Sequence, residues 1–381
     1  MAILFVADLT SAQSPHTMLQ SYLKTVGKNN VHSIHFLIET PDTLFADAVG
    51  FSDGKKLNAL PDDRFKIASM TKTLTATVIL QLMEEERLKL DDPIDIYLKD
   101  IYFVKVDQLH QFGGKSYGTI ITIKQLLQHR SGLADIFTDA AFRFNVREYF
   151  NRDIQWNPAK LMRQYYHYNL NKKAHFVPGN SYYYSDVNYF LLGIIIEKIT
   201  GQSLAQQFRT RILDPLAMNS TYLEFYEPPR GISNIAHSFL GKIDVTKKLN
   251  TSYDWAGGGI VSNNYDLAKF LKGLFTCKLF KKKETLDEMT TMIPHRKKLH
   301  QTGYYGLGLF QYEYNGTLFY GHSGFWGSTM GYSTEKKILF CGTINQVNAP
   351  FKSADFICDL LRIFDQSSST SILPRLSNRL L

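Results

Sequence analysis

Ser69 and Lys72 stand three residues apart in the run Ser69-Met70-Thr71-Lys72. The apolar residues that follow recur at helical spacing, which predicts a helix over residues 69–86 with one buried face. At a spacing of three on a helix, the serine hydroxyl and the lysine amine share a face. An amine kept neutral by desolvation can take the proton of the serine and so activate it as a nucleophile. By itself a Ser-x-x-Lys match is frequent by chance, and a capped, solvated helix is the alternative.

Two further short runs carry polar side chains at the ends of predicted elements. Tyr184-Ser185-Asp186 lies at the mouth of a helix predicted over residues 188–200, and an ordinary aromatic turn is the alternative. His322-Ser323-Gly324 lies at the end of a predicted strand, where the glycine lets another backbone approach closely. The order of the three runs along the chain decides the functional argument.

The sequence periodicity places these runs on an α+β framework. Strand patterns lie toward both ends of the chain and helix patterns between them, which indicates a sheet layer interrupted by a helical insertion. The first two strands are predicted to form a hairpin, because a turn containing Pro41-Asp42 separates them. The predicted helices cover residues 17–26, 69–86, 123–129, 188–200 and 354–364, and the predicted strands cover residues 34–38, 43–50, 318–321, 328–333 and 337–344.

Taken in order and with their flanks, the three runs resemble the serine β-lactamase and penicillin-binding-protein superfamily. The similarity is to its class C β-lactamase-like branch, which also holds D-amino-acid peptidases and esterases. The ordered set is far more specific than any single run. The stretches that carry the resemblance are residues 65–72, 88–94, 121–133, 184–193, 214–218 and 256–260, followed by His322-Ser323-Gly324.

The resemblance implies a fold and a division of the chain. An antiparallel sheet flanked by helices is expected beside a mostly helical subdomain, in a β-lactamase/transpeptidase-like arrangement with the active site between them. Residues 30–365 are expected to form a single catalytic domain. Its α/β part is expected at about residues 30–90 and 246–365 and its helical subdomain at about 91–245, after a leader and first helix at 1–29 and before a flexible tail at 366–381.

The resemblance also implies a role for each motif residue. Ser69 is expected to be the nucleophile that forms an acyl-enzyme, with Lys72 and Tyr184 sharing proton transfer. The backbone N–H groups of Ser69 and Phe325 are expected to form the oxyanion hole. The remaining expectations are Asp186, His322, Ser323 and Gly324 as supporting residues, and Tyr183 and Trp326 as walls of an aromatic substrate pocket, with Tyr182 beside them and core packing as its alternative role.

Two departures from the usual motifs narrow the chemistry. A lysine often stands where this chain has His322, so a fixed positive charge is replaced by a group with an ordinary pKa of about 6.5. Its imidazolium is expected to contact a substrate carboxylate as the pH falls toward about 6, and peptidase or esterase activity is at least as plausible as β-lactam hydrolysis.

The second departure is Asp186, where many relatives have asparagine. A carboxylate ~4 Å from Lys72 stabilises its ammonium form by about 4 kcal/mol at an effective dielectric of ~20. The ammonium is then expected to lower the pKa of Tyr184, so that the phenolate acts as the base.

The composition excludes several other classes of protein. The 381 residues are 44% hydrophobic and 20% charged, which is typical of a globular chain, and no apolar run is long enough to span a bilayer. The formal net charge is +8, but the densest basic runs, residues 281–283 and 296–298, are interpreted as solvated faces rather than a nucleic-acid site. The three cysteines are widely spaced, and neither a metal nor another cofactor is expected.

The N-terminus leaves two interpretations of the compartment open. The apolar residues 2–7 are either the remnant of a secretory signal that starts upstream or a leader before the first helix. The first interpretation predicts a periplasmic or secreted protein and the second a cytoplasmic one.

The expected function is a metal-independent serine hydrolase that forms an acyl-enzyme on an ester or amide. A D-amino-acid peptide, a small ester or a β-lactam is the expected class of substrate. The alternatives are a penicillin-binding or sensing module that acylates slowly and a scaffold without catalysis. The physiological substrate and the oligomeric state stay open.

Overall fold

The computed structural model describes residues 14–369, apart from residues 26, 28, 151–152, 247 and 297–301. Its centre is an eight-stranded sheet in the order β10-β11-β12-β13-β14-β15-β1-β2, in which every neighbouring pair is antiparallel. The strands are β1 (Ser33–Glu39), β2 (Leu44–Gly50), β10 (Ile293–Arg296), β11 (Thr302–Tyr305), β12 (Phe310–Tyr314), β13 (Thr317–Ser323), β14 (Ser328–Ser333) and β15 (Ile338–Thr343).

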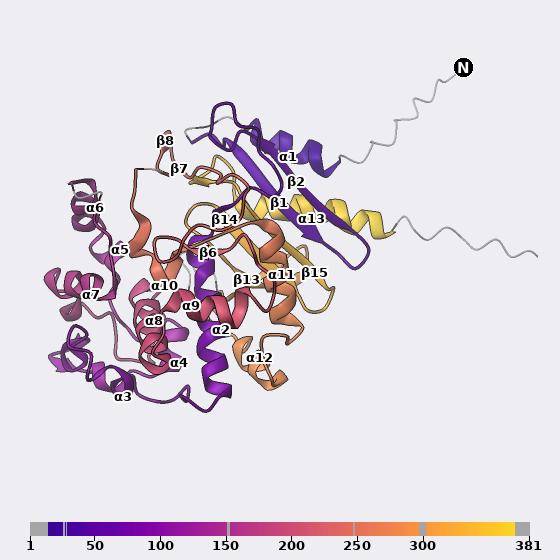
Figure 1. The fold of residues 1–381 in the computed structure, drawn as a ribbon. Coiled ribbons are helices and arrows are strands. Elements are labelled where there is room, and N and C mark those ends of the chain that lie inside the picture. Colours follow the sequence, from indigo (N-terminus) through magenta and orange to yellow (C-terminus); the bar gives the residue numbers. More distant parts are fainter. Residues whose placement is uncertain are drawn as a thin grey trace, which may run out of the picture.

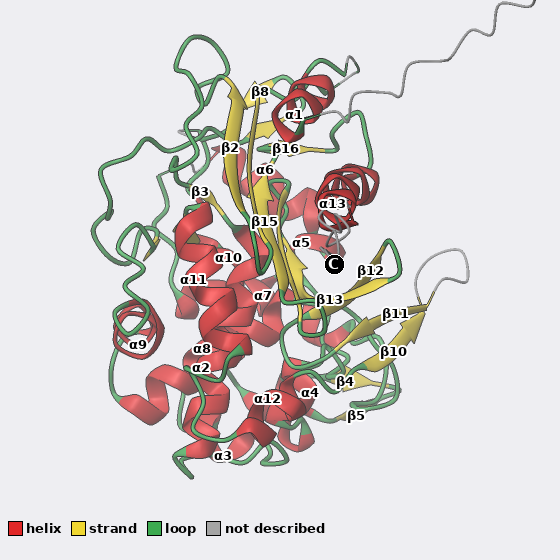
Figure 2. Ribbon diagram, turned by 90° about the vertical axis from the view of Figure 1, so that its right-hand side faces the viewer, coloured by secondary structure: helices red, strands yellow, loops and turns green. Residues whose placement is uncertain are grey.

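Helices cover both faces of the sheet. Figure 2 shows α1 (Pro15–Leu23) and α13 (Ser353–Ser369) on one face, and α2 (Thr71–Glu84), α8 (Asp186–Thr200) and α11 (Asn264–Phe275) on the other. Strands β14 and β15 are therefore buried along their whole length. This double coverage explains why β15 is largely apolar and why the polar residues of β14, such as Ser328 and Ser333, are buried as well.

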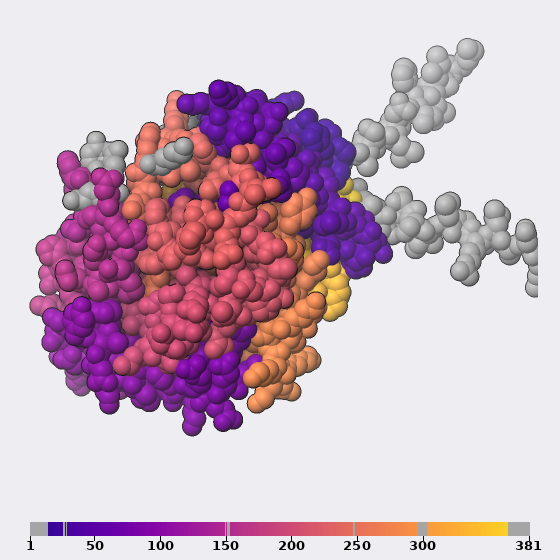
Figure 3. Space-filling model, in the orientation of Figure 1, coloured from indigo at the N-terminus to yellow at the C-terminus, as the bar shows by residue number. Residues whose placement is uncertain are grey.

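Two hydrophobic cores lie on the two sides of the sheet. Ile34, Phe36 and Ile38 of β1 pack in the core under α1 and α13, while Leu37 belongs to the larger core that contains α2 and α8. This division follows from the alternation of side chains along a strand. In Figure 3 the middle of the chain, coloured magenta to salmon, occupies the left of the molecule, and the indigo N-terminal part lies at the upper right.

Helix α2 runs through the interior and is buried nearly all round. Its threonines satisfy their hydroxyls on neighbouring backbone, because Thr73 Oγ1 donates to Gly308 O at 2.8 Å and Thr75 Oγ1 donates to Ala256 O at 2.7 Å. The helix and α13 lie on opposite faces of the sheet. A short 3₁₀ turn, η1 (Ala68–Met70), precedes the helix and contacts β13 and β14. This places the predicted nucleophile against the end of the sheet.

The remaining elements complete the helical side and the loops (Figure 1). The other helices are α3 (Asp95–Leu98), α4 (Ile123–Leu127), α5 (Ile136–Asp139), α6 (Ala141–Phe150), α7 (Pro158–His167), α9 (Leu204–Phe208), α10 (Trp255–Gly258) and α12 (Lys283–Met289). The other strands are short: β3 (Phe65–Lys66), β4 (Gln111–Phe112), β5 (Lys115–Ser116), β6 (Tyr222–Leu223), β7 (Phe239–Leu240), β8 (Ile243–Asp244), β9 (Ile260–Ser262) and β16 (Gln346–Val347).

The main predictions for the fold are confirmed. β1 and β2 form the expected hairpin, the three strands predicted in the last third are β13, β14 and β15, and α8 ends at Gly201 in the left-handed conformation that favours glycine. The division into an α/β part and a helical subdomain stays a prediction.

Three details of the fold were not expected. Strands β10, β11 and β12 were missed, because they are short and rich in tyrosine and polar residues. Ser69 lies in the 3₁₀ turn rather than in the helix that follows. Helix α13 continues to Ser369, so residues 366–369 of the predicted tail are helical. Residues 370–381 of the predicted tail, and residues 1–13 of the segment predicted as leader and first helix, lie outside the described part of the chain.

Candidate active site

The turn that carries Ser69 has an uncommon backbone conformation. Ala68 has a φ of 46°, which is a left-handed value that costs energy for a residue with a Cβ. Such conformations cluster at functional sites, where the surrounding structure maintains them. Strand β3, paired with β9, leads into this turn and α2 leads out of it, so Ser69 is positioned from both sides.

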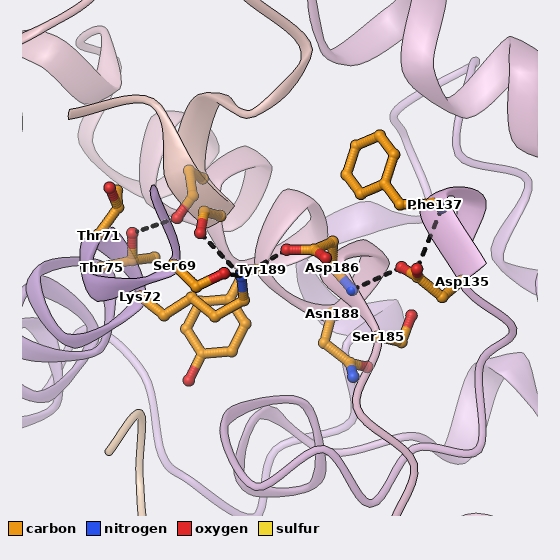
Figure 4. Close-up of polar contacts among 12 residues, drawn as sticks. Ser69, Thr71, Lys72, Thr75, Asp135, Phe137, Ser185, Asp186, Asn188 and Tyr189 are labelled. Carbon is orange, nitrogen blue, oxygen red and sulfur yellow. Dashed lines mark hydrogen bonds and ion pairs between the residues drawn. The ribbon is translucent and has the colours of Figure 1, made fainter. Parts of the chain in front are cut away.

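Lys72 holds the centre of the site. Its side chain is fully buried, and its Nζ lies 3.1 Å from Ser69 Oγ and 2.8 Å from the carbonyl oxygen of Gly257 (Figure 4). Its third contact is the carboxylate of Asp186, which the sequence predicted to lie near the amine. Three acceptors match the three N–H donors of an ammonium group, so the arrangement fits a protonated Lys72.

Two other acidic side chains surround Asp186. Asp135 accepts the backbone N–H of Asp186 at 2.8 Å and that of Phe137 at 3.0 Å, which ties the starts of α8 and α5 together (Figure 4). Burial, followed by the charge of Asp186, raises the pKa of Asp135. The same two causes raise the pKa of Asp254 to about 7. Near neutral pH the three acids therefore carry fewer than three charges.

Tyr184 lies beside the nucleophile, as predicted, but as a neutral phenol. It is hydrogen-bonded to Ser69, and Lys72 Nζ is 5.0 Å from the centre of its ring. Burial, and then the charge of Asp186, raise the pKa of Tyr184 well above its ordinary value, although the bond to Ser69 acts in the opposite direction. The expected phenolate base is therefore wrong for the free protein, because burial and the charge of Asp186 outweigh the hydrogen bond to Ser69 and keep the phenol neutral.

His129 was given no role by the sequence, although it lies in one of the family-like stretches. Its ring stacks on Tyr184 with centroids 4.1 Å apart, and its Nδ1 accepts from the Ser185 N–H at 3.2 Å and from Asn188 Nδ2 at 3.0 Å. Its carbonyl oxygen accepts the Tyr183 N–H at 3.0 Å. Burial lowers the pKa of His129 well below its ordinary value, so the ring is neutral with its proton on Nε2.

His322 is buried, which contradicts the expected imidazolium. Its Nδ1 donates to the carbonyl oxygen of Ser323 at 2.7 Å, and its Nε2 accepts from the hydroxyl of Tyr305 at 3.2 Å. Burial and the nearby charge of Lys72 lower the pKa of His322 to about 3. The ring is therefore neutral at pH 6, because Tyr305 and Phe310, on the strands that the sequence did not predict, close over it.

Gly324 brings the third motif against the nucleophile turn. A Cβ at this position would lie 2.3 Å from Ile67 O, so only glycine allows the approach. Ser328 Oγ donates to the same Ile67 oxygen at 2.9 Å and fastens the two segments. Within the part of the chain that the structure describes, the Phe325 N–H makes no hydrogen bond, which leaves it available for an oxyanion. The oxyanion hole of Ser69 and Phe325 stays a prediction.

The expected pocket residues have other neighbours. Trp326 is only 4% exposed and packs with Ala68, so it lies beneath the nucleophile turn and does not form an open wall. The Tyr183 hydroxyl donates to Asp139 at 2.9 Å, and its ring stacks on His175. Tyr182 stacks on His295. Ser323 is exposed and points away from His322, since neighbouring strand residues face opposite sides.

The described residues contain no group of three or more His, Cys, Asp or Glu side chains arranged to hold a metal ion. None of the helices they form has the length and apolar character that a membrane span requires.

The profile of the Beta-lactamase family matches residues 37–357, and this chain belongs to that family. Protein flp of Staphylococcus aureus is 27% identical over 265 residues, which are 69% of this chain and 48% of that protein. The chain thus spans about half the length of the curated relatives it matches.

Solved structures share the fold along nearly the whole chain. The D-stereospecific amidohydrolase from Streptomyces sp. has a TM-score of 0.75 at 28% identity and covers 90% of this chain and 97% of its own. The D-amino acid amidase from Ochrobactrum anthropi SV3 has a TM-score of 0.76 at 23% identity, covering 93% of this chain and 99% of its own, which shows the fold alone. The fold class is therefore the expected α+β, β-lactamase/transpeptidase-like one.

Proposed function

We propose that this chain is a serine hydrolase in which Ser69 attacks an ester or amide carbonyl and forms an acyl-enzyme that water then resolves. The observation that carries the proposal is the 3.1 Å contact between the Ser69 hydroxyl and the amine of Lys72 at the head of a buried helix. A serine next to a buried amine has a proton acceptor that water does not displace.

The proton of Ser69 needs an acceptor, and the pair of Lys72 and Asp186 supplies one. When the carboxylate takes a proton from the ammonium, the amine is free to accept the proton of Ser69. The neutral phenol of Tyr184 gives its own proton to the leaving group and is reprotonated by Lys72. The net change is one proton moved from Ser69 to the leaving group, one carbonyl bond broken and one acyl ester bond formed.

The backbone N–H groups of Ser69 and Phe325 are the proposed donors to the oxyanion of the tetrahedral intermediate. The approach of Gly324 to Ile67 supports this role, because it holds the segment that carries Phe325 against the turn that carries Ser69. The loss of one such donor typically costs about 3–4 kcal/mol of transition-state stabilisation.

An uncharged substrate suits this site better than one with a carboxylate. The neutral His322 stands where a fixed cation is often found, so a substrate carboxylate would lack a charged partner there. The 28% identity to a D-stereospecific amidohydrolase supports amides among the candidate substrates. Amides of D-amino acids and small esters are therefore proposed ahead of D-amino-acid peptides and β-lactams, which carry a carboxylate.

Labelling with a fluorophosphonate, followed by intact-mass analysis, tests the function. The folded protein should gain one adduct, and Ser69→Ala should gain none. Turnover is then measured with a chromogenic short-chain ester, a D-amino-acid anilide and a chromogenic cephalosporin. The absence of an adduct would remove the hydrolase, and an adduct without turnover of any substrate would indicate the slowly acylating alternative.

A further inference from the structure

A pocket of about 600 Å³ lies on the side of the third motif that faces away from His322. His322 is paired with Met330 of the core around α2, whereas Ser323 points to the face of the sheet that α13 covers (Figure 2). The pocket is within the size range of small-molecule sites. The lining residues used below are Ser323, Phe325, Thr329, Asn348, Ser353 and Ile357.

The pocket shares a wall with the nucleophile turn. Gly324 and Ser328 line it, and both contact Ile67, two residues before Ser69. Phe325, whose N–H is a proposed oxyanion donor, lines it as well and is 60% exposed. The pocket and the nucleophile turn therefore share the segment from Gly324 to Ser328 as a common wall.

The open edge of β13 leads from the site to the pocket. Strand β12 pairs with β13 only as far as Gly321, so none of the described strands pairs with the edge at His322 and Ser323 on that side. Tyr184, the proposed proton donor to the leaving group, lies beside His322 with ring centroids 6.3 Å apart. A leaving group that starts at Tyr184 and follows this edge passes His322 and then Ser323, which is a pocket wall.

The pocket carries no charge. Its described lining residues include neither Asp, Glu, Lys, Arg nor His, and its polar groups are hydroxyls and amides such as those of Ser323, Thr329 and Asn348. Burial raises the pKa of Tyr312 and of Tyr314, so these two lining phenols are neutral as well. A carboxylate placed here would lose water without gaining a cationic partner.

We propose that this pocket binds the uncharged leaving group of the ester or amide cleaved at Ser69, and that it discriminates against leaving groups that carry a carboxylate. The inference rests on the proposed hydrolase function. It adds a subsite, behind the Ser323 edge, that determines which alcohols or amines are released.

The test uses esters of one acyl group with four leaving groups: methanol, phenol, a carbamoylphenol and the carboxyphenol of the same shape. Ser353 and Ala354 are both exposed in the first turn of α13, but only Ser353 lines the pocket, so Ala354 supplies the matched control. Activity is followed as kcat/KM for each ester, by absorbance for the phenols and by acid release for methanol.

Filling and charging the pocket should have separate effects. Ser353→Trp should lower kcat/KM for the phenyl ester about tenfold and that for the methyl ester by less than about twofold, because only the larger group loses buried area. Ser353→Lys should raise kcat/KM for the carboxyphenyl ester up to about fivefold and leave the carbamoylphenyl ester unchanged. Ala354→Trp should leave the ratio of kcat/KM between the phenyl and methyl esters unchanged, and Ala354→Lys should leave the ratio between the carboxyphenyl and carbamoylphenyl esters unchanged.

Three results would overturn the inference. The first is that Ser353→Trp lowers kcat/KM equally for the methyl and phenyl esters. The second is that Ser353→Lys raises kcat/KM for the carboxyphenyl ester no more than Ala354→Lys does. The third is that kcat/KM of the variants depends on the size of the acyl group and not on the leaving group. In each case the hydrolase function survives, because turnover is still measured. No turnover of any ester, with no fluorophosphonate adduct, would overturn the function and the subsite together.

Discussion

At the scale of single residues, the ionisation of the site depends on one buried cation. Lys72 contacts Ser69, Gly257 and Asp186, and among the described residues it is the cation in contact with the serine. Burial, together with the charge of Lys72, lowers the pKa of His322, and burial, together with the charge of Asp186, raises the pKa of Tyr184, so both side chains are neutral. In the proposed mechanism, the carboxylate of Asp186 is thus the group that decides whether the lysine amine can accept a proton.

Replacing that carboxylate tests this role. In Asp186→Asn, Lys72 must release a proton to solvent before it can accept one from Ser69, so fluorophosphonate labelling at pH 7 should slow by about 10²-fold. The remaining rate should rise with pH more steeply than in the unsubstituted protein. The labelling rate is measured from pH 5 to 9, with the exposed Asp287→Asn as control. An unchanged pH profile would mean that Asp186 takes no part in the transfer.

Asp254 predicts a dependence of stability on pH. Its pKa is about 7 in the folded protein, while an aspartate in an unfolded chain titrates near 4, so the folded state binds the proton more tightly. The stabilisation is present below about pH 4 and is lost as the pH rises through about 7. Asp254→Asn should therefore raise the melting temperature at pH 8 more than at pH 5, as calorimetry would measure. An equal change at both pH values would contradict the shifted pKa.

At the scale of elements, His129 joins the loop after α4 to the start of α8. Its carbonyl and its Nδ1 bind the backbone on either side of Tyr184, and its ring supports the Tyr184 ring. Its φ is 55°, so it occupies a left-handed position that asparagine also tolerates. The residue therefore positions the phenol through the segment that carries it and has no contact with Ser69 in this structure.

Two substitutions test separately the stacked ring of His129 and the hydrogen-bond acceptor that its Nδ1 provides. His129→Asn keeps an oxygen that can accept from Ser185 and Asn188 but removes the stacked ring, so we expect about tenfold slower labelling and a loss of stability near 1 kcal/mol. His129→Phe keeps a ring but leaves two buried donors without an acceptor, which costs about 2–6 kcal/mol of unfolding free energy. Urea denaturation and labelling kinetics measure the two effects. Equal behaviour of both variants would refute the separate roles.

At the scale of the whole molecule, the sheet separates two cores with different tasks. The core around α2 and α8 carries the candidate site, and the core under α1 and α13 supports the opposite face. The two ends of the described chain meet in this second core, because α1 packs against α13 and the Tyr22 hydroxyl donates to Asp359 at 2.6 Å. Stability and chemistry are therefore expected to respond to different substitutions.

A substitution in the second core tests this separation. Leu360 of α13 is fully buried, so Leu360→Ala should lower the unfolding free energy by about 2–5 kcal/mol. The folded fraction should still label with fluorophosphonate at the original rate, because Ser69 lies on the other side of the sheet. The exposed Asp355→Ala of the same helix serves as control. Slower labelling of the folded fraction would show that the two cores are coupled.

The sequence alone determined the features that depend on residues a few positions apart along the chain. The spacing of Ser69 and Lys72 puts both on one turn, the turn at Pro41-Asp42 closes the β1–β2 hairpin, and Gly201 ends α8. Each of these follows from neighbours a few residues apart, whose geometry is set by backbone conformation. The ordered motifs also predicted the family, which the family profile confirms.

The tertiary structure decided the charge states and the surroundings of the site. His322 is neutral because the packed strands β11 and β12 bury it and the charge of Lys72, from a distant part of the chain, acts in the same direction. Tyr184 is neutral mainly because the fold buries it. His129 gains its role from a contact with a segment more than fifty residues away. A pKa depends on burial and on every nearby charge, so no spacing along the chain can supply it. The faces of the sheet likewise separate His322 from Ser323, and the packing of α13 beside that edge creates the pocket.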